Sequence, residues 1–319
     1  MKILLLLLLI LFSGLWLTSY VISYRIEQKF PPIGEYVKAN NARLHFVDTG
    51  AVADSSKPAV IFLHGASGNL RDQMHVYRPM LENEFRLVFP DRPGQGYSES
   101  FPGSHDPKEQ AKSVALLMDE LGIEKAVVSG HSFGGVVAAA FGVLYPEKTA
   151  GLVLLAPVAY PWGTGVDWHY DVASIPVIGW LFTNLLAVPA GSYIYSGAIE
   201  RVFAPDPLPD DYERVSGTRL ALRPASFLAN ARDVSKVEAH VEAFHNRYSE
   251  ITAPTYIFHG NRDDIVSLDI HSVNGLAKDV PGARLEVLDG VGHKPDYVAR
   301  DKVVAAIHEI AEGTSHASQ

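Results

Sequence analysis

Apolar and polar positions follow two different periods along most of the chain. Short apolar runs predict strands, and they lie at residues 58–65, 86–98 (a strand that ends in a Gly/Pro-rich loop), 125–129, 150–158, 254–260 and 283–290. Stretches with helical spacing lie between them, at residues 69–85, 108–122, 136–144, 270–278 and from Asp296 onward. A hairpin with its turn at Asn40-Asn41 precedes the first of these runs. The alternation predicts an α/β fold with a mostly parallel twisted sheet and helices on both faces.

One long stretch breaks this alternation. Residues 159–236 contain many prolines and aromatic residues and have no strand periodicity, so we predict a helical cap inserted between two strands. Ligands of open parallel sheets bind beyond the carboxyl ends of the strands, where such a cap would cover them. An independent packing domain is the alternative. The predicted division of the chain is an anchor at 1–28, a core at 35–158, the cap at 159–236, the rest of the core at 237–312 and a flexible tail at 313–319.

The amino terminus predicts a membrane anchor. Residues 3–22 carry no formal charge, and about 20 apolar residues are needed for a helix to cross a bilayer. A cleaved signal peptide has a shorter apolar core followed by small residues in an A-x-A pattern, whereas residues 17–20 read LTSY. We therefore predict an uncleaved single-pass helix, with a cleaved signal as the alternative. Because Lys2 and Arg25 lie at its two ends, the sidedness is poorly set, and we slightly favour an extracytoplasmic domain.

Composition excludes several other classes of function. The chain of 319 residues has a formal net charge of -9, whereas nucleic-acid binders usually present a basic face. It contains no cysteine, so disulfides, thiolate metal sites and a cysteine nucleophile are excluded. The segment GHSFGG lacks the G-x-G-x-x-G spacing of a dinucleotide-binding loop. We predict no nucleic-acid partner, no cofactor and no metal, and the sequence leaves the oligomeric state open.

Ser132 stands in a glycine-rich turn between a predicted strand and a predicted helix. Residues 130–134 read GHSFG, which fits the nucleophile-elbow motif G-x-S-x-G in its required context. So tight a turn forces its central residue towards unfavourable φ/ψ angles, and the glycines let the strand and helix approach each other. The start of the helix directs backbone N–H groups at any oxyanion that forms beside the serine. We predict that Ser132 is a nucleophile and that Phe133 N–H is an oxyanion donor.

A serine hydroxyl needs a base, and the base needs an orienting acid. The turn LDGVGHKPD supplies His293 after the last predicted strand, and FHGNRDDIV supplies Asp263 and Asp264 one strand earlier. The loop FLHGASGN follows a neighbouring strand, and from it we choose Ala66 N–H as the second oxyanion donor. The chain order is then Ser, Asp, His.

Five segments, HGASGN, DRPGQGYS, GHSFGG, HGNRDDIV and GVGHKP, together resemble the α/β-hydrolase fold family over about residues 35–310. The resemblance implies that fold, with an inserted cap, and it favours Asp263 over Asp264 as the acid. It also implies mainly structural roles for His64 and for the loop at residues 91–98. The site residues that it implies are Ser132, Asp263, His293, Ala66 and Phe133.

Two functions from different classes follow. The dehalogenase and epoxide-hydrolase branches of this fold are expected to have aspartate at position 132, so serine indicates acyl transfer to water. The first hypothesis is a membrane-anchored, carboxylesterase-like serine hydrolase of small acyl substrates, whose apolar character is suggested by Trp162, Trp168 and Tyr193 in the cap. Cleavage of amides, lactones or carbon-carbon bonds and peroxyacid formation stay open. The second hypothesis is a non-catalytic ligand-binding protein on the same fold. The presence of a complete set of nucleophile, base, acid and oxyanion loop argues against it.

Overall fold

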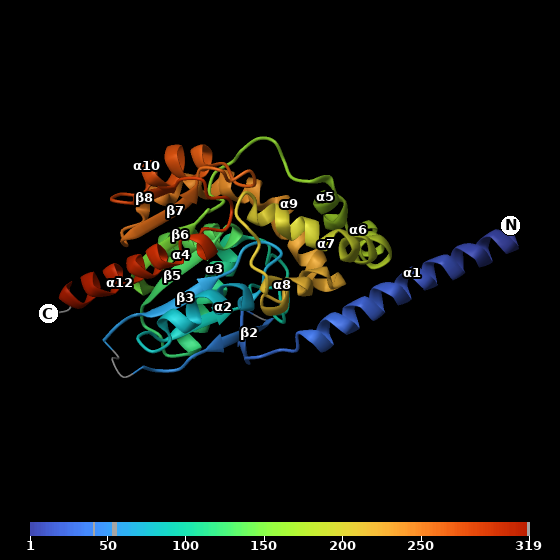
Figure 1. The fold of residues 1–319 in the computed structure, drawn as a ribbon, viewed down its shortest axis with the longest axis horizontal. Helices are drawn as coiled ribbons and strands as arrows, with labels where there is room; N and C mark the ends of the chain where they lie inside the picture. The colour runs from blue at the N-terminus through green and yellow to red at the C-terminus, as the bar shows by residue number, and fades with distance from the viewer. Residues whose placement is uncertain (41, 53–55, 318–319) are drawn as a thin grey trace.

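The computed structural model describes residues 1–40, 42–52 and 56–317. Within this part of the chain eight strands form one sheet in the order β1-β2-β4-β3-β5-β6-β7-β8 (Figure 1). The strands are β1 (Glu35–Ala39), β2 (Ala42–Asp48), β3 (Ala59–Leu63), β4 (Leu87–Pro90), β5 (Ala126–His131), β6 (Thr149–Leu155), β7 (Thr255–Gly260) and β8 (Arg284–Leu288). β2 is antiparallel to β1 and β4, and the other neighbours are parallel. The predicted mostly parallel sheet is confirmed.

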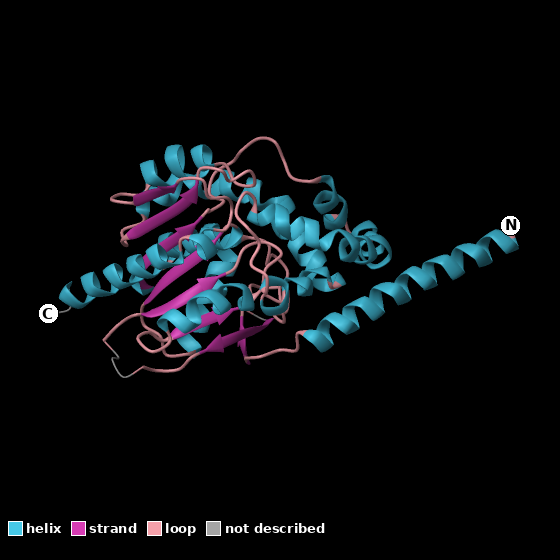
Figure 2. Ribbon diagram, in the orientation of Figure 1, coloured by secondary structure: helices cyan, strands magenta, loops and turns pink. Residues whose placement is uncertain are grey.

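Helices cover both faces of the sheet, as Figure 2 shows. α3 (Pro107–Glu120) and α4 (Phe133–Leu144) pack on one face, and α2 (Leu70–Leu81) and α12 (Arg300–Ala317) pack on the other. The shorter segments of the core are η1 (Pro146–Lys148), η4 (His245–Glu250), η5 (Asp269–Leu276), α10 (Ala277–Asp279) and α11 (Pro295–Val298).

Two predicted features, the flexible tail and the first turn, include residues that the structure does not describe. The backbone of α12 is helical as far as Ala317, and so extends into residues 313–319, which we expected to form a flexible tail. The last two residues of that tail lie outside the described residues. The predicted turn at Asn40-Asn41 joins β1 and β2, which pair antiparallel, but Asn41 also lies outside the described residues.

The chain between β6 and β7 is helical and lies beyond the carboxyl ends of the parallel strands (Figures 1 and 2). Its segments are α5 (Trp168–Ser174), α6 (Ile178–Phe182), the π-helical η2 (Thr183–Ala187), α7 (Val188–Phe203), α8 (Tyr212–Val215), η3 (Thr218–Leu222) and α9 (Pro224–Phe244). The last turns of α9 enter the main hydrophobic core through Val237, Val241 and Phe244. The cap helices are therefore joined to the body of the protein through α9.

The chain begins with one continuous helix, α1 (Lys2–Lys29), which extends away from the rest of the molecule in Figure 1. Its length and composition make it a candidate membrane span. The carboxyl-terminal part of α1 packs on the cap, where Ile26 and Phe30 join a buried cluster with Tyr195, Leu220 and Leu222.

Candidate active site

Ser132 lies at the sharp turn between β5 and α4, with φ 52° and ψ -116°. A non-glycine residue reaches this region only when the surrounding structure imposes it. The neighbouring glycines explain how the turn closes. A Cβ at Gly130 would lie 2.2 Å from the carbonyl oxygen of Gly134, and one at Gly134 would lie 2.1 Å from that of Leu63. The sequence thus folds locally into a strained turn that presents a hydroxyl group.

The loops after β7 and β8 bring Asp263 and His293 together. Asp263 Oδ2 lies 2.7 Å from His293 Nδ1, and Asp263 Oδ1 accepts the N–H groups of Ile265 and Val266 at 2.9 Å. Burial acts to raise the pKa of Asp263, but its electrostatic interaction with His293 and its hydrogen bonds with His259, His293 and the N–H of Val266 hold that pKa well below its usual range. The neighbouring Asp264 is exposed. The carboxylate is therefore ionised and fixed in one orientation on the imidazole.

The residue before Ser132 is hydrogen-bonded to the backbone of His293. Ser132 is preceded by His131, whose Nε2–H donates to the carbonyl oxygen of His293 at 2.7 Å. Burial and then the charge of Lys294 lower the pKa of His131 well below its usual value. Among the described residues no hydrogen bond joins Ser132 Oγ to His293 Nε2. The pairing of Ser132 with His293 therefore stays a prediction.

A second histidine, His259 at the end of β7, also contacts the acid. Its Nε2 lies 3.2 Å from Asp263 Oδ2 and 3.0 Å from the carbonyl oxygen of Val266, and its Nδ1 lies 2.7 Å from Ser272 Oγ. The sequence analysis missed this residue, although a histidine four positions before a predicted acid on a buried strand was the available signal. His259 helps to fix the carboxylate that faces His293.

The loop after β3 lies against the elbow on its other side. A Cβ at Gly65 would lie 3.1 Å from Ser132 Cβ and 2.9 Å from His131 Nδ1. Among the described residues, the N–H groups of Ala66 and Phe133 have no hydrogen-bond partner. An oxyanion site needs two such donors, and the assignment of Ala66 and Phe133 to it stays a prediction.

We expect Gly65→Ala to lower activity by up to about 100-fold, because the added methyl group would lie 2.9 Å from His131 Nδ1 and 3.1 Å from Ser132 Cβ, so that the loop or the elbow must shift, and misplacement near reacting groups can cost this much. The measurement is kcat/KM of the full chain for its hydrolysis reaction. Gly197→Ala is the matched control, since a Cβ there meets nothing within 4 Å. Equal activity of the two variants would show that the loop after β3 has no part in the reaction.

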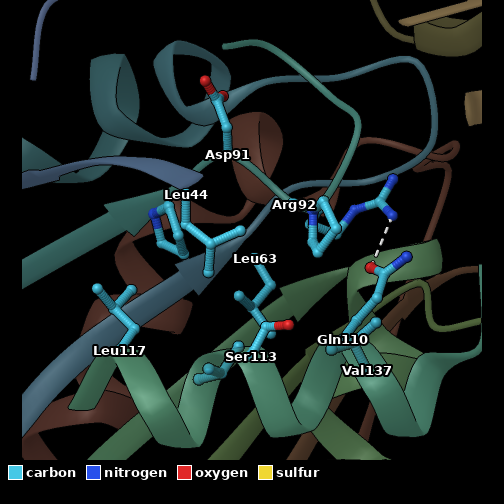
Figure 3. A pocket seen from close by; sticks show the side chains of 11 residues that line it. Leu44, Leu63, Asp91, Arg92, Gln110, Ser113, Leu117 and Val137 are labelled. Atoms are coloured by element: carbon cyan, nitrogen blue, oxygen red, sulfur yellow. Dashed lines mark hydrogen bonds between the residues drawn. The ribbon is translucent and has the colours of Figure 1, made fainter. Parts of the chain in front are cut away.

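Arg92, after β4, is buried behind this loop and holds it in place. Its Nε donates to the carbonyl oxygen of His64 at 2.8 Å, and its Nη2 donates to that of Gly65 at 3.1 Å. Figure 3 shows its guanidinium reaching towards Gln110 of α3, to which Nη1 donates at 3.0 Å, above a small cavity of about 10 Å³. Nη1 also pairs with Asp233 of the cap helix α9 at 2.9 Å. The resemblance implied a mainly structural role for the loop at residues 91–98, but nothing in the sequence singled out Arg92 within it.

The cap holds the loop from its other end as well. Asn230 of α9 accepts the N–H of Ser67 at 2.7 Å and donates to Ser67 Oγ at 3.0 Å. Ser67 has a φ of 55°, which these two bonds help to impose. Through Asn230 and Asp233, helix α9 therefore fixes the segment that contains Ala66.

The hydrogen bonds of His64 agree with the structural role that the resemblance implied. Its Nδ1–H donates to the carbonyl oxygen of Gly65 at 2.9 Å, and its Nε2 accepts the N–H of Arg92 at 3.0 Å. His271 of η5 similarly accepts the N–H groups of Ala159 and Tyr160 on its Nδ1, at 3.2 and 3.0 Å. Burial lowers the pKa of each histidine to about 4. The imidazoles of His64 and His271 are therefore neutral in the folded protein at pH 7.

This burial predicts that acid destabilises the protein. An unfolded histidine has a pKa of about 6.5, so the unfolded chain binds more protons and stability falls as the pH falls from about 6.5 towards 4. At pH 5, His64 and His271 each lower the free energy of unfolding by about 2 kcal/mol relative to pH 7. In His271→Gln we expect the loss between pH 7 and pH 5 to shrink by that amount, measured by guanidinium unfolding. The exposed His75→Gln serves as control, and an unchanged loss in His271→Gln would contradict the assignment.

The cap aromatics do not all face the site, which corrects the basis on which an apolar substrate was inferred. Trp168 is 68% exposed and Tyr193 is 92% exposed, so both point to the outside of the molecule. Trp162 is half-buried and lines an open cleft of about 650 Å³ beside Glu238 and Glu242 of α9. Aromatic content alone does not tell which face of a helix its residues occupy.

In the described part of the chain, no group of three or more His, Asp or Glu side chains is placed to hold a metal ion.

Comparison with known proteins agrees with this arrangement. The family model described as the alpha/beta hydrolase fold matches residues 58–295. The chain belongs to the α/β-hydrolase fold family. A 2-hydroxy-6-oxo-6-phenylhexa-2,4-dienoate hydrolase from Burkholderia cepacia is 28% identical over 276 residues, which cover 85% of this chain and 92% of that protein. Relatives of this kind support a hydrolase.

Two solved structures share the α/β-hydrolase fold with this chain. A thermophilic esterase from Thermogutta terrifontis has a TM-score of 0.70 and 23% identity, and the match covers 88% of this chain and 100% of that one. A bacterial membrane phospholipase A has a TM-score of 0.68 and 19% identity, covering 98% of this chain and 99% of that one. Because the second match covers nearly the whole chain, it includes most of α1.

Proposed function

We propose that this hydrolase cleaves ester bonds of small acyl substrates through a covalent acyl-enzyme, in the manner of a carboxylesterase. Ser132 is the nucleophile, His293 the general base and Asp263 the orienting acid, and the N–H groups of Ala66 and Phe133 bind the oxyanion. The observation that carries the proposal is the 2.7 Å contact between Asp263 Oδ2 and His293 Nδ1, beside a serine held at φ 52°.

The reaction then proceeds in two halves. His293 Nε2 takes the proton of Ser132 Oγ as the oxygen attacks the carbonyl carbon, and the negative charge of the tetrahedral intermediate forms between the two N–H donors. The ionised Asp263 stabilises the imidazolium, which returns the proton to the leaving alcohol as the ester bond breaks. Water, deprotonated by His293, attacks the acyl-enzyme, and the acid leaves as Ser132 regains its proton.

The membrane anchor belongs to the same proposal. Residues 3–22 have no charge, and α1 is a straight helix with the length and hydropathy of a span. The match to the membrane phospholipase A extends over nearly the whole chain. A single-pass anchor fits these observations, whereas the extracytoplasmic placement of the catalytic domain stays a prediction.

A panel of p-nitrophenyl esters graded by acyl length tests the proposed reaction with the full chain in detergent micelles. Turnover of short or medium acyl esters is the expected result. Saturable binding of these esters without release of p-nitrophenol would favour a ligand-binding protein on this fold instead.

A second candidate reaction is hydrolysis of a carbon-carbon bond. The observation that favours it is the 28% identity over most of the chain to the 2-hydroxy-6-oxo-6-phenylhexa-2,4-dienoate hydrolase. The same purified chain can be offered that dienoate, whose loss is followed by absorbance. A kcat/KM for the dienoate above that for every ester in the panel would make carbon-carbon cleavage the function.

A further inference from the structure

The cap presents an uncharged and apolar surface to the outside. Residues 172–199, 28 in succession, contain no Asp, Glu, Lys, Arg or His. Six large apolar side chains of this stretch are more than half exposed, and we call them the apolar cap face: Val177, Ile178, Trp180, Leu186, Tyr193 and Ile194. Elsewhere in the described chain, outside the cap and residues 1–29, each exposed large apolar side chain is less than half exposed. So many exposed apolar side chains in one uncharged stretch indicate a contact site.

The apolar cap face adjoins the candidate membrane helix. α1 contacts η2 and α7 of the cap, and in Figure 1 α5 and α6 lie on the side of the molecule from which α1 extends. The contacts of α1 begin only part-way along it, because residues 2–14 are exposed, Leu15 and Ile22 are half-buried and Ser19 is buried.

The free part of α1 is too short to cross a bilayer. Residues 2–14 at 1.5 Å per residue extend about 20 Å, whereas the hydrocarbon core is about 30 Å thick and needs about 20 residues. The apolar part of α1 does continue, since the first charged residue after Lys2 is Arg25. A span of sufficient length must therefore include about residues 15–22, and tilt of the helix would lengthen it further. These are the residues at which α1 meets the cap.

We propose that the apolar cap face is a second membrane-contact surface, inserted into the lipid bilayer beside α1. The inference rests on the proposed anchoring by α1, because the depth of that helix brings the cap to the membrane. The bend of 119° between α5 and the helix from Ile178 to Phe203 prevents this part of the cap from crossing the bilayer as one straight helix. It lies instead along the interface, where apolar helix faces enter about 5–10 Å deep. The absence of charge from residues 172–199 removes the main cost of that insertion.

The lack of cysteine in the chain allows a test with single labels on the full-length protein. Val177→Cys and the matched control Val287→Cys, on β8, each carry an NBD fluorophore, and the protein is reconstituted into phosphatidylcholine–phosphatidylglycerol vesicles. Val177 is 72% exposed and Val287 is 45% exposed, so neither label disturbs a core. We expect the Val177 label to emit at shorter wavelength, to be quenched by nitroxide-bearing lipids and to be several-fold less quenched by iodide than the Val287 label.

Two results would overturn the proposal. Iodide quenching of the Val177 label equal to that of the control means that water covers the face. Protection from iodide without quenching by nitroxide lipids means that protein covers it, such as a second copy of the chain. A label at Leu9→Cys reports on the anchor separately. If that label is lipid-quenched while the Val177 label is not, α1 is an anchor and the cap contact fails. If only the Val177 label is lipid-quenched, the cap contact holds without the anchor.

Discussion

Ser132→Ala is expected to lower kcat for ester hydrolysis about 10⁶-fold, the scale on which loss of a serine nucleophile acts in enzymes of this type. The substitution removes the atom that forms the acyl-enzyme and leaves the turn intact, because alanine meets the same backbone strain at φ 52°. The free energy of unfolding should therefore change little. Steady-state kinetics with the best ester of the panel, together with thermal unfolding, measures both quantities.

Ser129→Ala is the matched control for this experiment. Ser129 lies three residues earlier on β5, is also buried, and its Oγ has no hydrogen-bond partner among the described residues. Its replacement should leave kcat close to that of the parent. Activity retained in Ser132→Ala would mean that the acyl group is carried by another residue or that no acyl-enzyme forms.

Asp263→Asn is expected to lower kcat about 10⁴-fold without unfolding the protein. The amide has the shape of the carboxylate, and its oxygen can still accept the N–H groups of Ile265 and Val266, which Asp263 Oδ1 binds at 2.9 Å. Its NH₂ group then faces His293 Nδ1, which favours the tautomer with the proton on Nε2. That tautomer cannot accept the proton of Ser132.

Asp264→Asn controls for the loss of one negative charge at the same loop. Asp264 is exposed, and its replacement should leave kcat nearly unchanged. Determination of kcat/KM for both variants between pH 5 and pH 9 separates a change in the base from a change in binding. A large loss in Asp264→Asn with activity retained in Asp263→Asn would transfer the role of acid to Asp264.

The fold could be predicted from the sequence because its signals are local. The alternation of apolar runs with helical spacing gave the mostly parallel sheet, and the glycines around Ser132 indicated the turn between β5 and α4. Those glycines are required by contacts within a few residues, such as Gly130 against Gly134, so the motif itself contains the reason for the shape.

Contacts between distant segments could not be predicted in this way. Arg92 and Asp233 are 141 positions apart in the chain and pair inside the molecule, and nothing in either segment indicates the other. Asp263 and Asp264 are adjacent and chemically equal, so their difference lies in the direction of each side chain relative to the loop after β8. Only the folded arrangement places one carboxylate on His293 and the other in solvent.

The cap was predictable in kind but not in the direction of its side chains. Prolines and missing periodicity indicated an irregular helical insertion, yet the outward orientation of Trp168 and Tyr193 follows from how the helices pack. The sequence of α1 likewise did not predict that one side of this helix is buried against the cap, because the helix is apolar on every side. Composition identified these segments as apolar and left open what they contact.

The assignment of Ser132 as the nucleophile requires an activated hydroxyl at the elbow, which a serine-reactive fluorophosphonate detects without a known substrate. The full chain and Ser132→Ala are treated in detergent micelles, and their intact masses are compared. We predict a single adduct on the parent chain that is absent from the variant. A folded parent chain that gains no adduct, or a variant that gains the same one, would contradict the assignment of Ser132 as the nucleophile.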